Sequence, residues 1–539
     1  MKKIALACLI FALPASGGFV GALQPPASQN RATLGAAGAT DWRKGIPEVT
    51  APPEAFFKRY GGKEEAVARK FYKKYIAVKG GLNVAAAGEV ADDALKRTYY
   101  IVTHMLAGRP DVLDVMVKRG TKLIIIGKDQ VYTDMPEYRN HNNPEYQNER
   151  VRGTGGLGVT SFGEENLLNL PIDRYDDESI AVHEFCHTID AALRQADASF
   201  SGRLSKTYKN ATSKGLWKYA YAGGNQGEYW AEVCQSYFDC NRVNNWNHNS
   251  IATREQLKLY DPDAYELVHT TFKLTAENDW RLEPIQKQPS VIPPPAKFKA
   301  NPYYTKFTFA REFTVLGSPK VSDEAMLKAN DTIRKMFAYR HDILKAMIYD
   351  GCRLVVLGKN EKLSDLPEFK ETRNKIGFEE IRFLDYTPNV KLLVVPEENV
   401  LRTADDGFAG KSMVVSVFAK GLYQVTALRP TQAIKGQKQQ YELRVKRMDT
   451  EFDKRLKTTF DEAMKKGLWK GTPTARTRVE YWATGVEAYF DATGAGFPPH
   501  NHPRPITTRE ALKAYDPALY ALVDETMTYT EHVDWRFPR

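Results

Sequence analysis

The sequence predicts an α+β fold, mainly helical with a small mixed sheet, that occurs twice in tandem. Short β-branched runs indicate strands, and longer segments with helical periodicity and helix-end signals indicate helices. Motifs that recur in the same order indicate the tandem copy. The chain has 539 residues and 42% hydrophobic residues, enough for several domains with real cores.

The expected elements of the first copy begin with two helices, at 92–106 and 111–118. The β-branched run 121–126 predicts a strand. The glycine-rich stretch 155–162 is expected to lead into another strand, which could edge a cleft.

Two further helices are expected to carry the residues with chemical potential. The first spans 176–193, and its acidic start, Asp176-Asp-Glu178, suits the N-terminal end of a helix dipole. The second spans 225–238.

Repeated motifs define the two copies. Each motif keeps its chain order and most of its residues. The matched pairs are Thr-Arg-Glu-x-Leu-Lys-x-Tyr-Asp-Pro at 253–262 and 508–517, Lys-Gly-Leu-Trp at 214–217 and 466–469, and Glu-Tyr-Trp-Ala at 228–231 and 480–483.

Composition divides the remaining chain. Residues 1–22 have the basic start, apolar run and small-residue end of a secretory signal peptide, so a secreted or extracytoplasmic protein is expected; an N-terminal membrane anchor is the alternative. Residues 23–41 are expected to form a disordered linker. The first copy then occupies 42–284, a stiff Pro-rich linker 285–302, and the second copy 303–539.

The charge pattern excludes some partners. The formal charge is +10, and removal of Lys2 and Lys3 with the leader would leave +8 on a large surface. No basic block or binding fingerprint indicates nucleic acid. No later segment is apolar enough for stable membrane insertion.

The strongest chemical signal is His183-Glu184-Phe-Cys-His187. Helix positions four apart lie on one face, so both imidazoles can bind one metal ion. Glu184 then lies beside the water that the metal carries and is the candidate general base. This pattern is typical of zinc-dependent hydrolysis of amide bonds and predicts one Zn²⁺ per chain.

A third ligand must come from elsewhere in the fold. Glu228 lies 41 residues after His187, and Glu232 follows one helical turn later. One acid would bind metal while the other orients a histidine, and spacing leaves their roles open. Three histidines are alternative third ligands, but we expect them to be surface or core residues. Cys186 is expected to be a buried small hydrophobe or a disulfide partner. The rivals are His141, His248 and His269.

These residues resemble the catalytic domain of anthrax toxin lethal factor and its relatives, which include the secreted Pro-Pro endopeptidases. The resemblance is strongest over 175–240 and implies a zincin-type, gluzincin-like metallopeptidase. It implies that Glu228 is the third zinc ligand and that Glu232 supports the site. It also implies that Tyr221, seven residues before Glu228, stabilises the oxyanion.

The second copy lacks these residues. Register through Lys-Gly-Leu-Trp puts Lys435, Gly436 and Gln439 opposite the first motif. The upstream match of Leu-Ile-Ile-Ile-Gly-Lys at 123–128 with Leu-Val-Val-Leu-Gly-Lys at 354–359 indicates a smaller offset. No histidine lies between His341 and His500, so the second copy is expected to be catalytically inactive. The other counterparts in this register are Pro473 for Tyr221, Glu480 for Glu228 and Thr484 for Glu232.

The sequence therefore predicts a secreted zinc endopeptidase with a protein or peptide substrate and a degenerate C-terminal domain. That domain could recognise a protein partner. Two alternatives stay open: a binding protein with a vestigial metal site, and a metal-dependent amidase that acts on cell-wall material.

Overall fold

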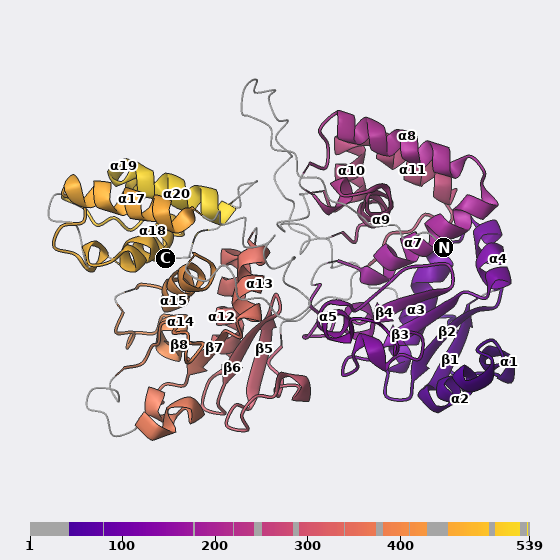
Figure 1. The fold of residues 1–539 in the computed structure, drawn as a ribbon, viewed down its shortest axis with the longest axis horizontal. Coiled ribbons are helices and arrows are strands. Elements are labelled where there is room, and N and C mark those ends of the chain that lie inside the picture. The colour runs from indigo at the N-terminus through magenta and orange to yellow at the C-terminus, as the bar shows by residue number, and fades with distance from the viewer. Residues whose placement is uncertain are drawn as a thin grey trace. The chain divides into compact units, whose positions relative to one another are not determined.

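The computed structural model describes residues 42–78, 80–175, 178–218, 220–241, 251–283, 290–338, 340–372, 381–408, 410–427, 451–494, 502–528 and 536. Helices and strands are mixed throughout this part of the chain, which confirms the expected α+β class (Figure 1). We call residues 42–283 the N-terminal half and residues 290–536 the C-terminal half. The predicted signal peptide and the linker 23–41 lie outside the described residues.

A four-stranded mixed sheet forms the base of the N-terminal half, in the order β1-β2-β3-β4. β1 runs antiparallel to β2, whereas β2, β3 and β4 run parallel to one another. The last four residues of the run predicted as a strand, Leu123 to Ile126, are fully buried, as expected of a strand covered on both faces. The strands are β1 (Tyr72–Val78), β2 (Leu82–Ala87), β3 (Lys122–Ile126) and β4 (Val159–Gly163).

The four helices predicted in the N-terminal half agree with observed helices within a few residues, except at one start. α7 begins at Ile180, because the Ser179 side chain accepts a hydrogen bond from the Val182 amide and caps the helix there. Asp176 and Asp177 lie outside the described residues. The helices are α1 (Glu54–Phe57), α2 (Gly62–Phe71), α3 (Asp92–Met105), α4 (Pro110–Arg119), α5 (Pro144–Arg150), α6 (Glu164–Leu167), α7 (Ile180–Ala196), α8 (Phe200–Ser213), α9 (Gln226–Tyr237), α10 (Arg254–Tyr260) and α11 (Pro262–Phe272), with 3-10 turns η2 (Tyr132–Asp134) and η3 (Tyr221–Gly223).

α7 lies between the sheet and the helices α8–α11 (Figure 1). Its apolar residues Phe185 and Ile189 are buried. The Trp230 indole of α9 donates a 2.9 Å hydrogen bond to the Cys186 carbonyl, in the middle of α7. The helix with the two histidines is therefore fixed on both sides.

The C-terminal half repeats this order of elements around a second sheet, β5-β6-β7-β8, with the same antiparallel and parallel pairings. Part of the predicted linker joins this half, since Ile292 and Phe307 exchange two backbone hydrogen bonds. The strands are β5 (Lys306–Ala310), β6 (Phe313–Gly317), β7 (Arg353–Leu357) and β8 (Leu392–Pro396). The helices and turns are η4 (Ala296–Phe298), α12 (Asp323–Met336), α13 (His341–Tyr349), η5 (Leu363–Asp365), η6 (Pro367–Thr372), α14 (Glu397–Leu401), α15 (Met413–Leu422), η7 (Tyr423–Ala427), α17 (Phe452–Lys465), η8 (Pro473–Ala475), α18 (Arg478–Tyr489), α19 (Arg509–Tyr515) and α20 (Pro517–Thr528).

The repeated Trp, Tyr and Asp-Pro motifs form the same buried hydrogen-bond network in each half. Asp261 Oδ2 accepts from the Trp217 indole at 2.8 Å and from the Tyr229 hydroxyl at 2.7 Å. Asp516 Oδ2 accepts from Trp469 and Tyr481 at 2.9 and 2.7 Å. These motifs join helices, so their recurrence has a structural cause that is independent of catalysis.

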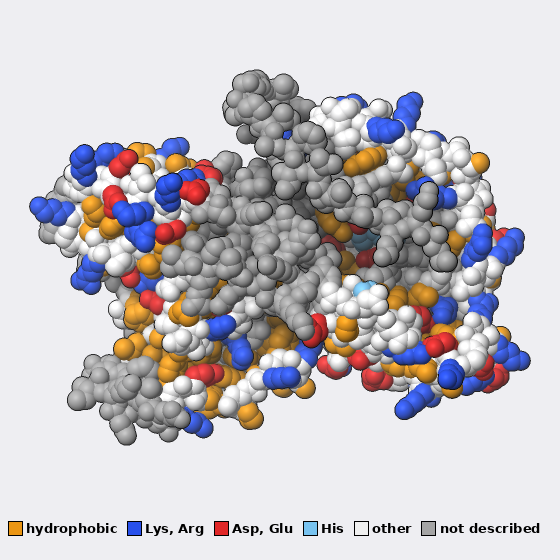
Figure 2. Space-filling model, in the orientation of Figure 1, with side chains coloured by type: hydrophobic (Ala, Val, Ile, Leu, Met, Phe, Trp, Pro, Cys, Tyr) orange, Lys and Arg blue, Asp and Glu red, His pale blue; other side chains and the backbone are white. Residues whose placement is uncertain are grey.

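The surface carries mixed charges. On the face shown in Figure 2, Lys and Arg side chains are interspersed with Asp and Glu rather than gathered in a single-sign patch. Among the described helices, none is both long and apolar enough to cross a bilayer.

Candidate metal centre

Three predicted ligands come together where α7 meets α9. His183 and His187 lie one turn apart on α7, and Glu228 lies in the first turn of α9. The N-cap Asn225 accepts hydrogen bonds from the amides of Gly227 and Glu228, which fixes this first turn.

The three ligand atoms form a compact triangle. His183 Nε2 lies 3.2 Å from Glu228 Oε2 and 3.3 Å from His187 Nε2, and the third side, from His187 Nε2 to Glu228 Oε2, is 3.5 Å. Ligands at about 2.0–2.1 Å from a tetrahedral zinc ion stand about 3.3–3.4 Å apart, so the triangle fits one face of such a site. Within the described residues, this is the one group of three His, Cys, Asp or Glu side chains close enough to share a metal ion.

The charges of this group suit a cation. Burial acts to raise the pKa of Glu228, but hydrogen bonds with His183 and His187 lower it to about 2. The carboxylate is therefore ionised at neutral pH. The Glu228 and His187 side chains are 20% and 23% exposed, which leaves the site open to solvent on one side.

Glu184 follows His183 directly on α7. Burial raises the pKa of its carboxyl above the usual value, although His183 and His187 oppose that rise. A raised pKa makes a carboxylate a better proton acceptor near neutral pH.

The rival histidines do not join the group. His141 lies on the surface and accepts from the Asn143 amide at 3.2 Å. His269 Nδ1 lies 2.8 Å from the Tyr237 hydroxyl, and its ring stacks on Tyr265. His248 lies outside the described residues.

Nδ1 of His183 has two neighbours on α9, and one of them is Glu232, as the sequence suggested. Glu232 Oε1 lies 3.5 Å from His183 Nδ1, and its other oxygen accepts from Asn241 at 3.2 Å. Gln235 Oε1 lies closer, at 2.8 Å from the same nitrogen. Sequence reasoning missed Gln235, although it lies seven residues after Glu228 and so on the same face of α9.

Tyr221 lies over the same site from η3. Its ring is nearly parallel to that of His183, at 28°, with centroids 6.1 Å apart. Tyr221 is 37% exposed, one of few large hydrophobic side chains that the described surface leaves open.

A glycine-rich loop approaches α7 from the sheet. A Cβ at Gly155 would lie 2.2 Å from the Glu184 carbonyl oxygen and 2.6 Å from His187 Cβ. Thr154 forms a backbone bridge to Ser161 in β4. Only glycine permits this approach, which confirms the predicted link between the loop and a strand near the site.

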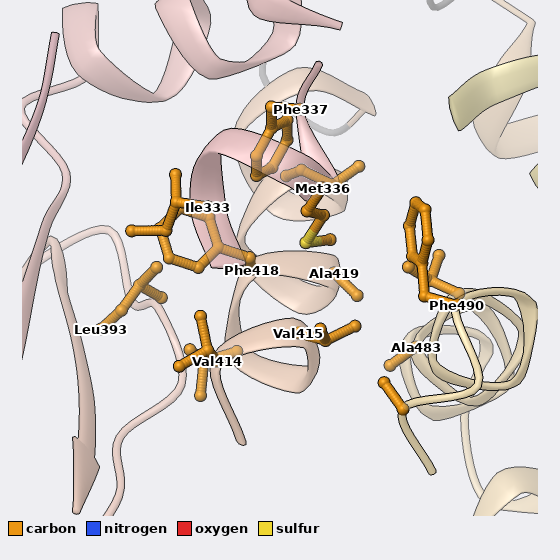
Figure 3. Close-up of a cluster of buried hydrophobic side chains, with 14 of the residues drawn as sticks. Ile333, Met336, Phe337, Leu393, Val414, Val415, Phe418, Ala419, Ala483 and Phe490 are labelled. Atoms are coloured by element: carbon orange, nitrogen blue, oxygen red, sulfur yellow. The ribbon is translucent and has the colours of Figure 1, made fainter. Parts of the chain in front are cut away.

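In the C-terminal half, α15 takes the position of α7. Figure 3 shows α15 between Leu393 and Ile333 on one side and Ala483 and Phe490 on the other. The Trp482 indole donates to the Ala419 carbonyl at 3.0 Å, as Trp230 does to Cys186.

This hydrogen bond corrects the predicted register. The true counterparts of the motif residues are Ser416 for His183, Val417 for Glu184 and Lys420 for His187. The offset is 233 through α15 and becomes 252 only from α17, because the C-terminal half has extra residues between these helices. Lys435, Gly436 and Gln439 lie in that extra segment, outside the described residues.

Lys420, which aligns with His187, carries a positive charge at the position of a candidate metal ligand. Its ammonium group lies 2.8 Å from Glu480 Oε1 and 3.0 Å from Asp385 Oδ2, and its side chain is only 9% exposed. Burial acts to lower the Lys420 pKa, but the charges of Asp385 and Glu480 outweigh it and raise the pKa. Glu480, the counterpart of Glu228, is therefore paired with a cation from the chain itself.

The four cysteines of the described residues are free thiols in buried positions. Cys186 is fully buried between the helices, as expected for a small hydrophobe, and takes no part in the triangle of ligand atoms.

No known family model matches this chain, and no curated protein is significantly similar to it.

Proposed function

We propose that the N-terminal half is a zinc-dependent endopeptidase. One observation carries the proposal: His183 Nε2, His187 Nε2 and Glu228 Oε2 lie 3.2–3.5 Å apart, the spacing of three ligands on one zinc ion. Two imidazoles and one carboxylate are also the donor set of thermolysin-type hydrolases. When bound, zinc supplies the Lewis acidity that such peptide hydrolysis needs.

The protein residues divide the remaining work. The Glu184 carboxylate accepts a proton from the attacking water and returns it to the leaving amine nitrogen. Its raised pKa favours both steps near neutral pH. The Tyr221 hydroxyl donates to the developing oxyanion, a role supported by the stacking of its ring over His183.

The proposal extends to the architecture of the chain. The two halves repeat the same elements and sheet order, which supports an internal duplication of a zincin-type domain. The resemblance to lethal factor-like metallopeptidases supports the same interpretation. In this view the C-terminal half is an inactive copy, free to recognise a protein partner, and the N-terminal leader directs secretion.

Metal stoichiometry tests the proposal first. The full-length protein, supplemented with zinc and then dialysed, should retain about one zinc per chain by elemental analysis. Two ions per chain, or none, would contradict the assignment.

Activity distinguishes the proposed enzyme from its two alternatives. A random peptide library should be cleaved by the zinc-loaded protein and spared after chelation. Zinc binding with no cleavage would favour a binding protein, and release of fragments from cell-wall material alone would favour an amidase.

A further inference from the structure

We propose that Gln235 is a positioning residue that holds His183 in the tautomer with a proton on Nδ1. Nε2 then keeps its lone pair for a metal ion. This inference rests on the proposed function of the site and adds a residue to it.

The hydrogen bonds around Gln235 determine which way its amide faces. Nε2 of Gln235 lies 3.1 Å from the carbonyl oxygen of Ser179. A carbonyl oxygen only accepts, so the amide nitrogen must face Ser179. The amide oxygen must then face His183, whose Nδ1 lies 2.8 Å away.

This orientation determines that Nδ1 of His183 carries a proton. An amide oxygen only accepts, so Nδ1 of His183 must donate to it. In a neutral imidazole with a proton on Nδ1, Nε2 carries a lone pair. That nitrogen is the one that lies 3.2 and 3.3 Å from the other two candidate ligand atoms.

Burial makes the arrangement rigid. Gln235 and Ser236 are fully buried, and His183 is 6% exposed, so water does not compete for these bonds. Ser179 is the N-cap of α7. Gln235 therefore ties α9 to both the start of α7 and its first histidine.

Glu232 is a weaker candidate for this task. It lies 3.5 Å from Nδ1, beyond an ordinary hydrogen bond, and its other oxygen already accepts from Asn241.

The test compares zinc affinity in full-length variants by competition with a fluorescent chelator. Q235M keeps the side-chain length but removes the acceptor, and should weaken zinc binding about 10- to 100-fold. Q235E keeps an acceptor and should retain most of the affinity. Glu487 stands at the equivalent position of α18, which indicates that the fold accommodates this residue.

S236A is the matched control. Ser236 is buried in the same turn, and its hydroxyl lies within hydrogen-bond distance of the carbonyl oxygens of Ile251 and Glu232, at 2.8 and 3.1 Å. Its loss should lower the melting temperature of the metal-free protein and leave zinc affinity unchanged.

The outcomes separate the two proposals. Wild-type affinity in Q235M, or an equal loss in Q235E and Q235M, would overturn the role of Gln235 and leave the zinc site standing. A wild-type protein that binds no zinc would instead overturn the proposed function.

Discussion

The two halves place different positively charged or metal-binding groups beside equivalent glutamates. Each begins a buried helix, α9 or α18, with a glutamate that faces the neighbouring helix, and each glutamate needs a positive partner. In the N-terminal half Glu228 faces two imidazoles that can share a metal ion. In the C-terminal half Glu480 faces the ammonium of Lys420. Each glutamate therefore lies beside groups that can balance its charge, two imidazoles in one half and an ammonium group in the other.

The comparison also shows that scaffold and chemistry are separable. The Asp261 and Asp516 networks are alike to within 0.1 Å in their indole bonds, 2.8 and 2.9 Å, although only one half keeps the histidines. These networks do not include the candidate metal ligands, so each half can keep them whether or not it has the two histidines.

The largest expected effect concerns Glu184, which has no acidic counterpart in α15. E184Q should keep its zinc and lose peptide cleavage by about 10²–10⁴-fold, because only the proton acceptor is removed. Cleavage rates and zinc content are measured on the same sample. E480Q is the control and should cleave normally; an active E184Q would refute the assigned base.

Tyr221 is the next position at which the halves differ, since η8 has Pro473 there. Y221F should keep zinc and lose about 100-fold in kcat, the scale of one oxyanion donor. Steady-state kinetics on a cleaved library peptide measure this. An unchanged kcat would remove Tyr221 from the mechanism.

The comparison can be reversed by restoring ligands to α15. S416H/K420H places two imidazoles opposite Glu480 and should raise the zinc content from about one to about two per chain. Val417 still provides no base, so E184Q combined with this pair should remain inactive. A zinc content that stays at one would show that ligand positions in the C-terminal half are not equivalent to those of α7.

The smallest expected effect comes from Lys420 alone. K420M leaves Asp385 and Glu480 without their shared cation, and should lower the free energy of unfolding of the C-terminal half by about 1–2 kcal/mol, because both acids can still reach water. Urea titration measures this change. Zinc content and cleavage should not change, and a loss of either would mean that Lys420 supports the other half.

Local patterns were sufficient for much of the candidate site. His183 and His187 share a face because a helix repeats every 3.6 residues. The spacing of the apolar positions around Asn225 and Glu228 predicted α9 for the same reason. The strand β3 and the helices α3, α4 and α7 were predicted from the same kind of local pattern, whereas β1, β2 and the remaining helices of this half were not predicted. The start of α7 was misplaced because acidic residues suit a helix start in general, whereas the actual cap is a single hydrogen bond that the Ser179 side chain accepts from the Val182 amide.

Other features depend on contacts between distant segments. The sequence did not determine the register of α15 against α7, because the motifs before and after the extra segment indicate different offsets. The hydrogen bond from the Trp482 indole to the Ala419 carbonyl selects one of these offsets. Gln235 was missed because its role requires Ser179 and His183 on both sides of its amide. Helical periodicity depends only on neighbouring residues of one segment, so the sequence alone predicts it. The partner of a buried charge or amide depends on which helices pack against each other, so only the tertiary structure determines it.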